Sequence, residues 1–136
     1  MKKILGTVAA TTVAAGAFLA GGAAPALAAE PGCRVSYIPV TQSAGYVATV
    51  LVTNTSSTPV TGWTLGFELP AGQQVASSWS TRLTVTGSSV TARNAIWNGY
   101  LAANGGTGTF GFEGAYTGTY SSPSSFTLNG QACTKS

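Results

Sequence analysis

Apolar and polar residues alternate in short runs from residue 46 to the end of the chain, and Gly, Asn, Ser and Pro separate the runs. Trp63, Leu65, Phe67 and Leu69, for example, occupy every second position. A period of two places such side chains on one face of a strand. The pattern predicts strands within residues 46–53, 60–69, 73–79, 83–85, 90–92, 108–116 and 125–129. Because no helical spacing is found beyond residue 28, we expect an all-β fold, an antiparallel β-sandwich of the jelly-roll or immunoglobulin-like type with seven or eight short strands.

The first 28 residues have the features of a secretory signal peptide. Two lysines follow the initiating Met, a stretch rich in Gly, Ala and Thr carries no charge, and Ala26-Leu27-Ala28 provides a small-x-small cleavage pattern. We predict cleavage after Ala28, with Ala29 as the alternative, and therefore a secreted, extracellular domain at residues 29–136. A transmembrane helix is the competing interpretation. The abundance of small residues and the cleavage pattern disfavour it.

The chain is poor in charge, which limits the classes of partner that it is expected to bind. Charged residues make up 7% of the sequence and the net charge is +3, part of which lies in the predicted signal peptide. No basic run follows, so we expect neither nucleic acid nor membrane as a partner. The abundance of Ser, Thr, Gly and Asn suits a neutral, hydroxylated ligand, and the domain is expected to be a monomer.

The two cysteines, Cys33 and Cys133, lie near the two ends of the predicted domain. In an oxidising compartment we expect them to form one disulfide. A redox or metal-binding pair is the alternative, and the absence of histidine from the sequence makes it remote.

The inventory of residues excludes most hydrolytic chemistry. The sequence contains no histidine and no aspartate, so neither a catalytic triad nor an imidazole metal site can be assembled. The acids are Glu30, Glu68 and Glu113. Glu30 lies near the predicted terminus, and the other two have the parity of outward-facing strand positions. We therefore expect no enzyme, no cofactor and no metal.

The three tryptophans have different surroundings. Trp63 shares its parity with three large hydrophobic residues, which predicts a core position. Trp79 ends a polar strand, and Trp97 lies in a turn-like segment between two strands. For these two the pattern leaves exposure and burial about equally open. If both are exposed, they form an apolar surface that calls for a ligand.

A series of motifs between the two cysteines resembles the bacterial family 2 carbohydrate-binding module. The motifs, in chain order, are Cys33-Arg34-Val35, Val52-Thr53-Asn54-Thr55, Gly62-Trp63-Thr64-Leu65, Pro70-Ala71-Gly72-Gln73, Trp97-Asn98-Gly99, Phe110-Gly111-Phe112 and Leu128-Asn129-Gly130. The resemblance implies a β-sandwich with bridged terminal cysteines and a planar aromatic face that adsorbs to crystalline cellulose, sometimes to chitin. By the same resemblance, Trp79 and Trp97 match two of the family's three surface tryptophans, and Trp63 matches its buried one.

One surface tryptophan of the cellulose-binding subgroup has no counterpart. In an ungapped match Gln42 stands at its position, and Tyr100 is a candidate substitute ring. An ordinary exposed tyrosine is the other interpretation of Tyr100. The segment that holds Trp79 tends to be missing from xylan-binding members, so its presence favours the cellulose-like subgroup.

Two classes of function follow. The first is a non-catalytic, secreted module that binds an insoluble β-glucan such as cellulose, or chitin or xylan, through Trp79 and Trp97, with Gln42 and Tyr100 as weaker candidates. The second is a secreted β-sandwich that binds a protein or a small apolar ligand, as an inhibitor or a carrier does.

Overall fold

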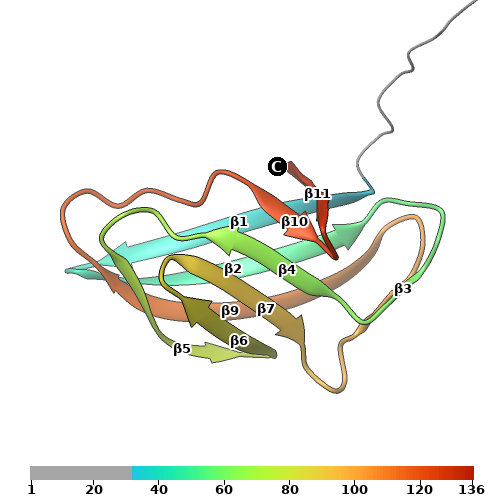
Figure 1. Cartoon of the computed structure of the whole chain (residues 1–136), viewed down its shortest axis with the longest axis horizontal. Helices are drawn as coiled ribbons and strands as arrows, with labels where there is room; N and C mark the ends of the chain where they lie inside the picture. Colours follow the sequence, from blue (N-terminus) through green and yellow to red (C-terminus); the bar gives the residue numbers. More distant parts are fainter. Residues whose placement is uncertain (1–31) are drawn as a thin grey trace, which may run out of the picture. The chain divides into compact units, whose positions relative to one another are not determined.

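The computed structural model describes residues 32–136, which form two five-stranded sheets and a short ribbon (Figure 1). In spatial order, the first sheet contains β12 (Thr134–Lys135), β1 (Cys33–Gln42), β2 (Gly45–Asn54), β9 (Gly106–Tyr116) and β5 (Gln73–Trp79). The second sheet contains β11 (Gln131–Ala132), β10 (Phe126–Leu128), β4 (Thr64–Glu68), β7 (Ser89–Asn94) and β6 (Thr81–Thr86). The ribbon pairs β3 (Val60–Thr61) with β8 (Tyr100–Leu101).

Neighbouring strands run antiparallel throughout the described residues, except for β1 and β12, which are parallel. The prediction of an all-β antiparallel sandwich is confirmed. The structure divides the chain into more strands than the seven or eight expected, because several elements are only two or three residues long.

The core lies between the two sheets and is built from alternate residues of the long strands. Its largest fully buried side chains are Trp63, Phe110, Phe112, Phe126, Leu65 and Leu101. The indole of Trp63 stacks on the ring of Phe110, with ring centroids 5.6 Å apart. Trp63 is only 1% exposed, in keeping with the parity of its segment. Alternation along each strand therefore leaves one side of each sheet facing outward.

Two local predictions need correction. Residues 60–69 do not form one strand: β3 and β4 belong to different sheets, and the chain turns between them at Gly62, which has φ +89°. A positive φ is a conformation that glycine adopts without steric cost, so the motif marks a turn inside an apparently continuous alternation. The strand β1 was not predicted, because Ile38 and Val40 on its outer side obscure the alternation with the buried Val35 and Tyr37.

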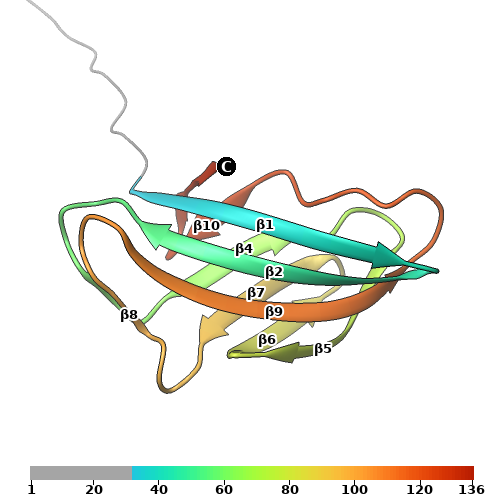
Figure 2. The same ribbon diagram turned by 180° about the vertical axis from the view of Figure 1, so that it is seen from behind.

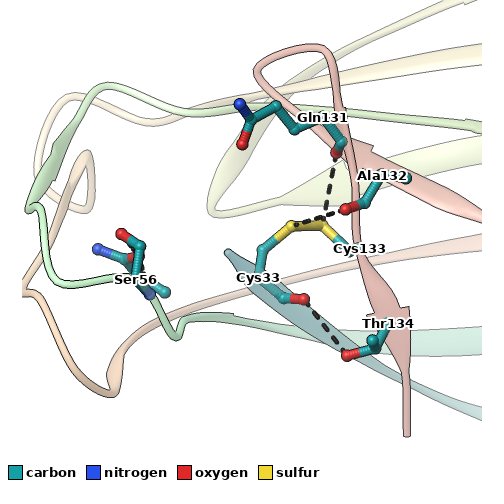
Figure 3. Close-up of a disulfide and its surroundings, with 7 residues drawn as sticks. Cys33, Ser56, Gln131, Ala132, Cys133 and Thr134 are labelled. Atoms are coloured by element: carbon teal, nitrogen blue, oxygen red, sulfur yellow. Dashed lines mark hydrogen bonds between the residues drawn. A yellow bond between two sulfur atoms is a disulfide. The ribbon is translucent and has the colours of Figure 1, made fainter. Parts of the chain in front are cut away.

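A disulfide joins Cys33 at the start of β1 to Cys133 between β11 and β12 (Figure 3). The predicted pairing is therefore confirmed, and the two Cα atoms lie 4.8 Å apart. Beside it, the Thr134 hydroxyl donates a hydrogen bond to the Cys33 carbonyl over 3.3 Å. The two cysteines are separated by 100 positions in the sequence. In the chain-entropy model, closing a loop of this length stabilises the fold by about 4–5 kcal/mol.

Among residues 32–136, no helix is long and apolar enough to cross a bilayer. The predicted signal peptide, residues 1–28, lies outside the described part of the chain. Cleavage after Ala28 or Ala29 therefore remains a prediction from the sequence.

Candidate functional site

Trp79 is the last residue of β5, the edge strand of the first sheet. It is paired with Gly111 of β9, whose neighbours Phe110 and Phe112 point into the core. A Cβ atom added at Gly111 would point outward and collide with the indole of Trp79. The indole therefore lies across Gly111 on the outer side of the sheet, where it is 44% exposed. The indole is therefore partly packed against the sheet and partly open to solvent.

The next residue turns the chain from the first sheet to the second. Ser80 has φ +61°, in the left-handed region, and the chain continues directly into β6. This corner holds the end of β5 in place, because the Ser80 carbonyl accepts a hydrogen bond from the Asn98 side chain.

Trp97 lies in the connection between β7 and β8. The connection begins at the buried Ala95, and then exposes Ile96 and Trp97; Trp97 is 75% exposed. In Figures 1 and 2 this connection projects from the same edge of the domain at which β5 meets β6. Two large aromatic side chains of the described residues are thus presented to solvent at this edge.

Asn98 ties the two tryptophan segments together. Its side-chain nitrogen donates to the Ser80 carbonyl over 2.8 Å, and its side-chain oxygen accepts from the Ala95 amide over 2.7 Å. Its backbone carbonyl accepts a hydrogen bond from the indole nitrogen of the buried Trp63 over 2.8 Å. One residue therefore connects the core, the residue after Trp79 and the segment that carries Trp97.

The outer side of the first sheet faces the viewer in Figure 2, and the register aligns its outward-facing residues in rows across β1, β2, β9 and β5. One row, in register, is Ile38, Thr49, Gly111 and Trp79. The next row is Val40, Val47, Glu113 and Ser77. We call this surface the outer face of the first sheet; it is apolar toward β1 and carries the indole at β5.

The two weaker candidates lie at different places. Gln42 is exposed at the end of β1, on the outer face of the first sheet, and its carbonyl accepts a hydrogen bond from the Tyr116 hydroxyl over 3.2 Å. Strand and register spacings put it about 20 Å from Trp79 across that face. Tyr100 on β8 is 61% exposed, with its neighbour Leu101 fully buried. The structure brings the segments of Trp79 and Trp97 together, and it leaves Gln42 at the far end of the sheet.

Sequence reasoning assigned no role to Asn98 or Gly111. Both stand inside the motifs that carried the family resemblance, but their contacts join segments far apart in the chain. A glycine between two buried phenylalanines was the available signal for Gly111, because it indicates a gap in the outer side of the strand.

The acids among the described residues cannot act as a hydrolytic pair. Glu68 of β4 and Glu113 of β9 lie on the outward sides of opposite sheets. Hydrogen bonds from the hydroxyls of Ser89 and Ser88 lower the pKa of Glu68. Paired carboxylates must flank a single glycosidic bond, which these two positions cannot do. No group of three or more His, Cys, Asp or Glu side chains within residues 32–136 is arranged to hold a metal ion.

Comparison with protein families gives a match over residues 33–133 to a family described as cellulose binding domain. The chain is 50% identical over 102 residues to Exoglucanase B of Cellulomonas fimi; that alignment covers 75% of this chain and 9% of the exoglucanase. It is 42% identical over 91 residues to a protein of Mycobacterium tuberculosis named as a cellulose/chitin binding protein, covering 67% of this chain and 63% of that one. The chain thus spans less than two thirds of the length of these relatives.

Among solved structures, the chain resembles the chitin-binding domain of Chi18aC from Streptomyces coelicolor. The TM-score is 0.61 at 34% sequence identity, and the match covers 75% of this chain and 94% of that domain.

Proposed function

This chain belongs to the family of cellulose-binding domains, which are non-catalytic polysaccharide-binding modules, and we propose that it adsorbs to insoluble cellulose through the indoles of Trp79 and Trp97. The observation that carries the proposal is the exposure of both rings at one edge of the domain, held by the hydrogen bonds of Asn98. An exposed apolar surface on a fixed scaffold is unfavourable in water unless a ligand covers it.

The chemistry of a β-glucan suits these two rings. A pyranose ring presents C–H groups on its flat faces and hydroxyls around its edge. A tryptophan side chain has about 150–250 Å² of surface, of which one face is roughly half. At about 25 cal/mol per Å², stacking one face on a sugar contributes about 2–3 kcal/mol before ordering costs. Two such rings together contribute about 4–6 kcal/mol, which corresponds to dissociation constants from about 1 mM down to about 40 μM when both meet the ligand without rearrangement.

The packing of Trp79 reduces the ordering cost. Its indole already packs against Gly111, while 44% of the side chain remains exposed. A side chain that is immobilised before binding loses less conformational entropy when the ligand arrives. Beside it on the outer face lie Thr49 and Ser77, whose hydroxyl groups can form hydrogen bonds with the hydroxyls at the edges of sugar rings.

Chitin is a second candidate ligand, favoured by a specific observation. The structural neighbour at 34% identity is a chitin-binding domain, and the mycobacterial relative is named for both cellulose and chitin. Both polymers present the same C–H faces to an indole. Xylan is a third candidate, and its pyranose rings differ in lacking the hydroxymethyl group that each glucose unit of cellulose carries.

We also propose that the module is exported. The features of residues 1–28 and the disulfide between Cys33 and Cys133 both fit an oxidising, extracellular compartment. In this proposal residues 29–136 form the mature binding module, and its partner is the polysaccharide surface.

The test is adsorption to microcrystalline cellulose, chitin and insoluble xylan, measured as isotherms for the wild type, Trp79→Ala and Trp97→Ala. Each variant is expected to keep the wild-type circular dichroism spectrum and to bind at least about 10-fold more weakly. Val85→Ala, at an exposed apolar position on β6, is the control and is expected to bind as the wild type does.

The competing function, binding of a protein or a small apolar ligand, is tested in the same preparation. A screen of soluble ligands with tryptophan fluorescence as the readout is expected to show no change. A shift with a soluble apolar ligand, together with wild-type protein that stays in the supernatant over every polysaccharide, would replace the proposal.

A further inference from the structure

Glu113 places a carboxylate beside the exposed indole of Trp79. It follows Gly111 by two positions on β9, so both residues face the outer side of the first sheet. Two residues along a strand span about 7 Å, and the indole lies over Gly111 itself. The carboxylate is therefore about one sugar ring away from the centre of the stacking surface.

The position of this carboxylate is set by β5. Ser77, two residues before Trp79, is paired with Glu113, and its hydroxyl donates to the Glu113 carboxylate over 3.0 Å. Glu113 is exposed, and among the described residues its polar partner is this hydroxyl. One carboxylate oxygen remains open to a ligand lying on the face.

Nothing cationic stands near Glu113 on this face within residues 32–136. Arg82 and Arg93 are paired with each other on the second sheet, and the Lys135 amine donates to the Pro123 carbonyl. Arg34 lies six positions from Val40 along β1, at the other end of the first sheet. The row that contains Glu113 is otherwise uncharged: it consists of Val40, Val47 and Ser77.

We propose that Trp79 and Glu113 together form a site for a β-linked amino sugar with a free, protonated amine, as found in partially deacetylated chitin. The C–H face of the sugar covers the indole, and the ammonium group at the edge of a ring meets the carboxylate. This inference rests on the proposed function, because it places the polysaccharide on the same aromatic surface. It adds a preference for a polymer with protonated amines over neutral polymers whose rings stack equally well on the indole.

A neutral polymer offers Glu113 only hydroxyls or amides, whereas an ammonium group offers a charge-assisted hydrogen bond. Exposed ion pairs of this kind correspond to a change in affinity of about 1.5- to 5-fold. The preference is expected to weaken in high salt, because the Debye length shortens to about 3 Å at 1 M.

The experiment compares adsorption of the wild type, Glu113→Gln and Glu68→Gln to partially deacetylated chitin and to cellulose, in mildly acidic buffer at low salt. The readout is the ratio of the two affinities. Both substitutions raise the net charge equally, but Glu68 lies on the opposite sheet, so it is the matched control. We expect the ratio to fall about 1.5- to 5-fold in Glu113→Gln and to stay at the wild-type value in Glu68→Gln. The difference should disappear in 1 M salt and in alkaline buffer, where the amine is neutral.

A ratio that is unchanged in Glu113→Gln, or that falls equally in Glu68→Gln, would overturn this inference and leave the proposed function standing. Wild-type protein that binds neither cellulose nor chitin would instead overturn the proposed function. Trp79→Ala is expected to weaken binding to both polymers, which separates the shared stacking surface from the charge preference.

Discussion

The indole of Trp79 occupies the space above Gly111 into which any other residue would project its Cβ atom. The two residues are directly paired across β5 and β9. The glycine thus serves as a platform that lets a large ring lie flat on a sheet instead of standing away from it.

Substitution of Gly111 tests this relationship. In Gly111→Val the added side chain is expected to push the indole off the sheet, and adsorption to cellulose should weaken about 10-fold or more, as for loss of one stacked ring. Gly111→Ala should have a smaller effect in the same direction. Adsorption isotherms and the fluorescence maximum of the tryptophans report both changes. Thr109→Ala, on the same side of β9, is the control, and a Gly111→Val variant that binds normally would contradict this geometry.

Asn98 is expected to position both rings without touching the ligand. In Asn98→Asp the side-chain acceptor for the Ala95 amide is kept, while the donor to the Ser80 carbonyl is lost. In Asn98→Ala both bonds are lost, whereas the backbone acceptor for Trp63 remains. We expect stability to fall by about 1–3 kcal/mol in Asn98→Ala, because a partly buried amide loses its partner.

Both Asn98 variants should adsorb more weakly than the wild type under conditions where they are fully folded. Urea unfolding gives the stability, and isotherms with fluorescence anisotropy give the binding and the mobility of the rings. Adsorption at wild-type strength by a folded Asn98→Asp would show that the Ser80 hydrogen bond does not position the site.

Trp63 should behave in the opposite way to the exposed tryptophans. It is buried and stacked on Phe110, so Trp63→Ala leaves a large cavity and is expected to cost about 3–5 kcal/mol of stability. Urea unfolding measures the loss. The fraction that remains folded should still adsorb, and a stable Trp63→Ala protein that has lost adsorption would place this ring in the binding site instead.

Two tyrosines of the core are expected to make the stability of the fold depend on pH in the alkaline range. Burial, and the charge of nearby Tyr120, raise the pKa of Tyr46 to about 12. Burial and the hydrogen bond between the Tyr37 and Tyr120 hydroxyls also raise the pKa of Tyr37. The unfolded chain loses these protons near its ordinary pKa of about 10, while the folded chain retains them. The contribution of these two tyrosines to the free energy of unfolding is therefore fully present below pH about 10 and is lost as the pH rises toward 12.

Denaturant unfolding at several alkaline pH values measures this slope, and the absorbance of ionised tyrosine follows the titration. Tyr46→Phe removes one titrating group and should flatten the slope. A slope that is the same in Tyr46→Phe and in the wild type would contradict the role of burial at this residue.

The sequence predicted the parts of this structure that depend on local alternation. The core position of Trp63 followed from its parity with Leu65 and Phe67, and the sandwich followed from the series of short strands. β1 was missed because apolar side chains occur on both of its sides, which removes the period-two signal.

Exposure of Trp79 and Trp97 could not be decided from their own segments. What holds the indole of Trp79 outward is Gly111, which is paired with it from a distant strand. The segment of Trp97 is fixed by the hydrogen bond from the Asn98 side chain, beyond the end of β7, to the Ser80 carbonyl at the corner between β5 and β6. Long-range pairing of this kind has no signature in a local pattern.

The most direct test of the account is an adsorption isotherm of the double variant Trp79→Ala/Trp97→Ala on microcrystalline cellulose, with folding checked by circular dichroism. The account predicts a folded protein that stays in the supernatant, because both stacking surfaces are gone. A folded double variant that adsorbs as strongly as the wild type would contradict the claim that these two rings bind the polysaccharide.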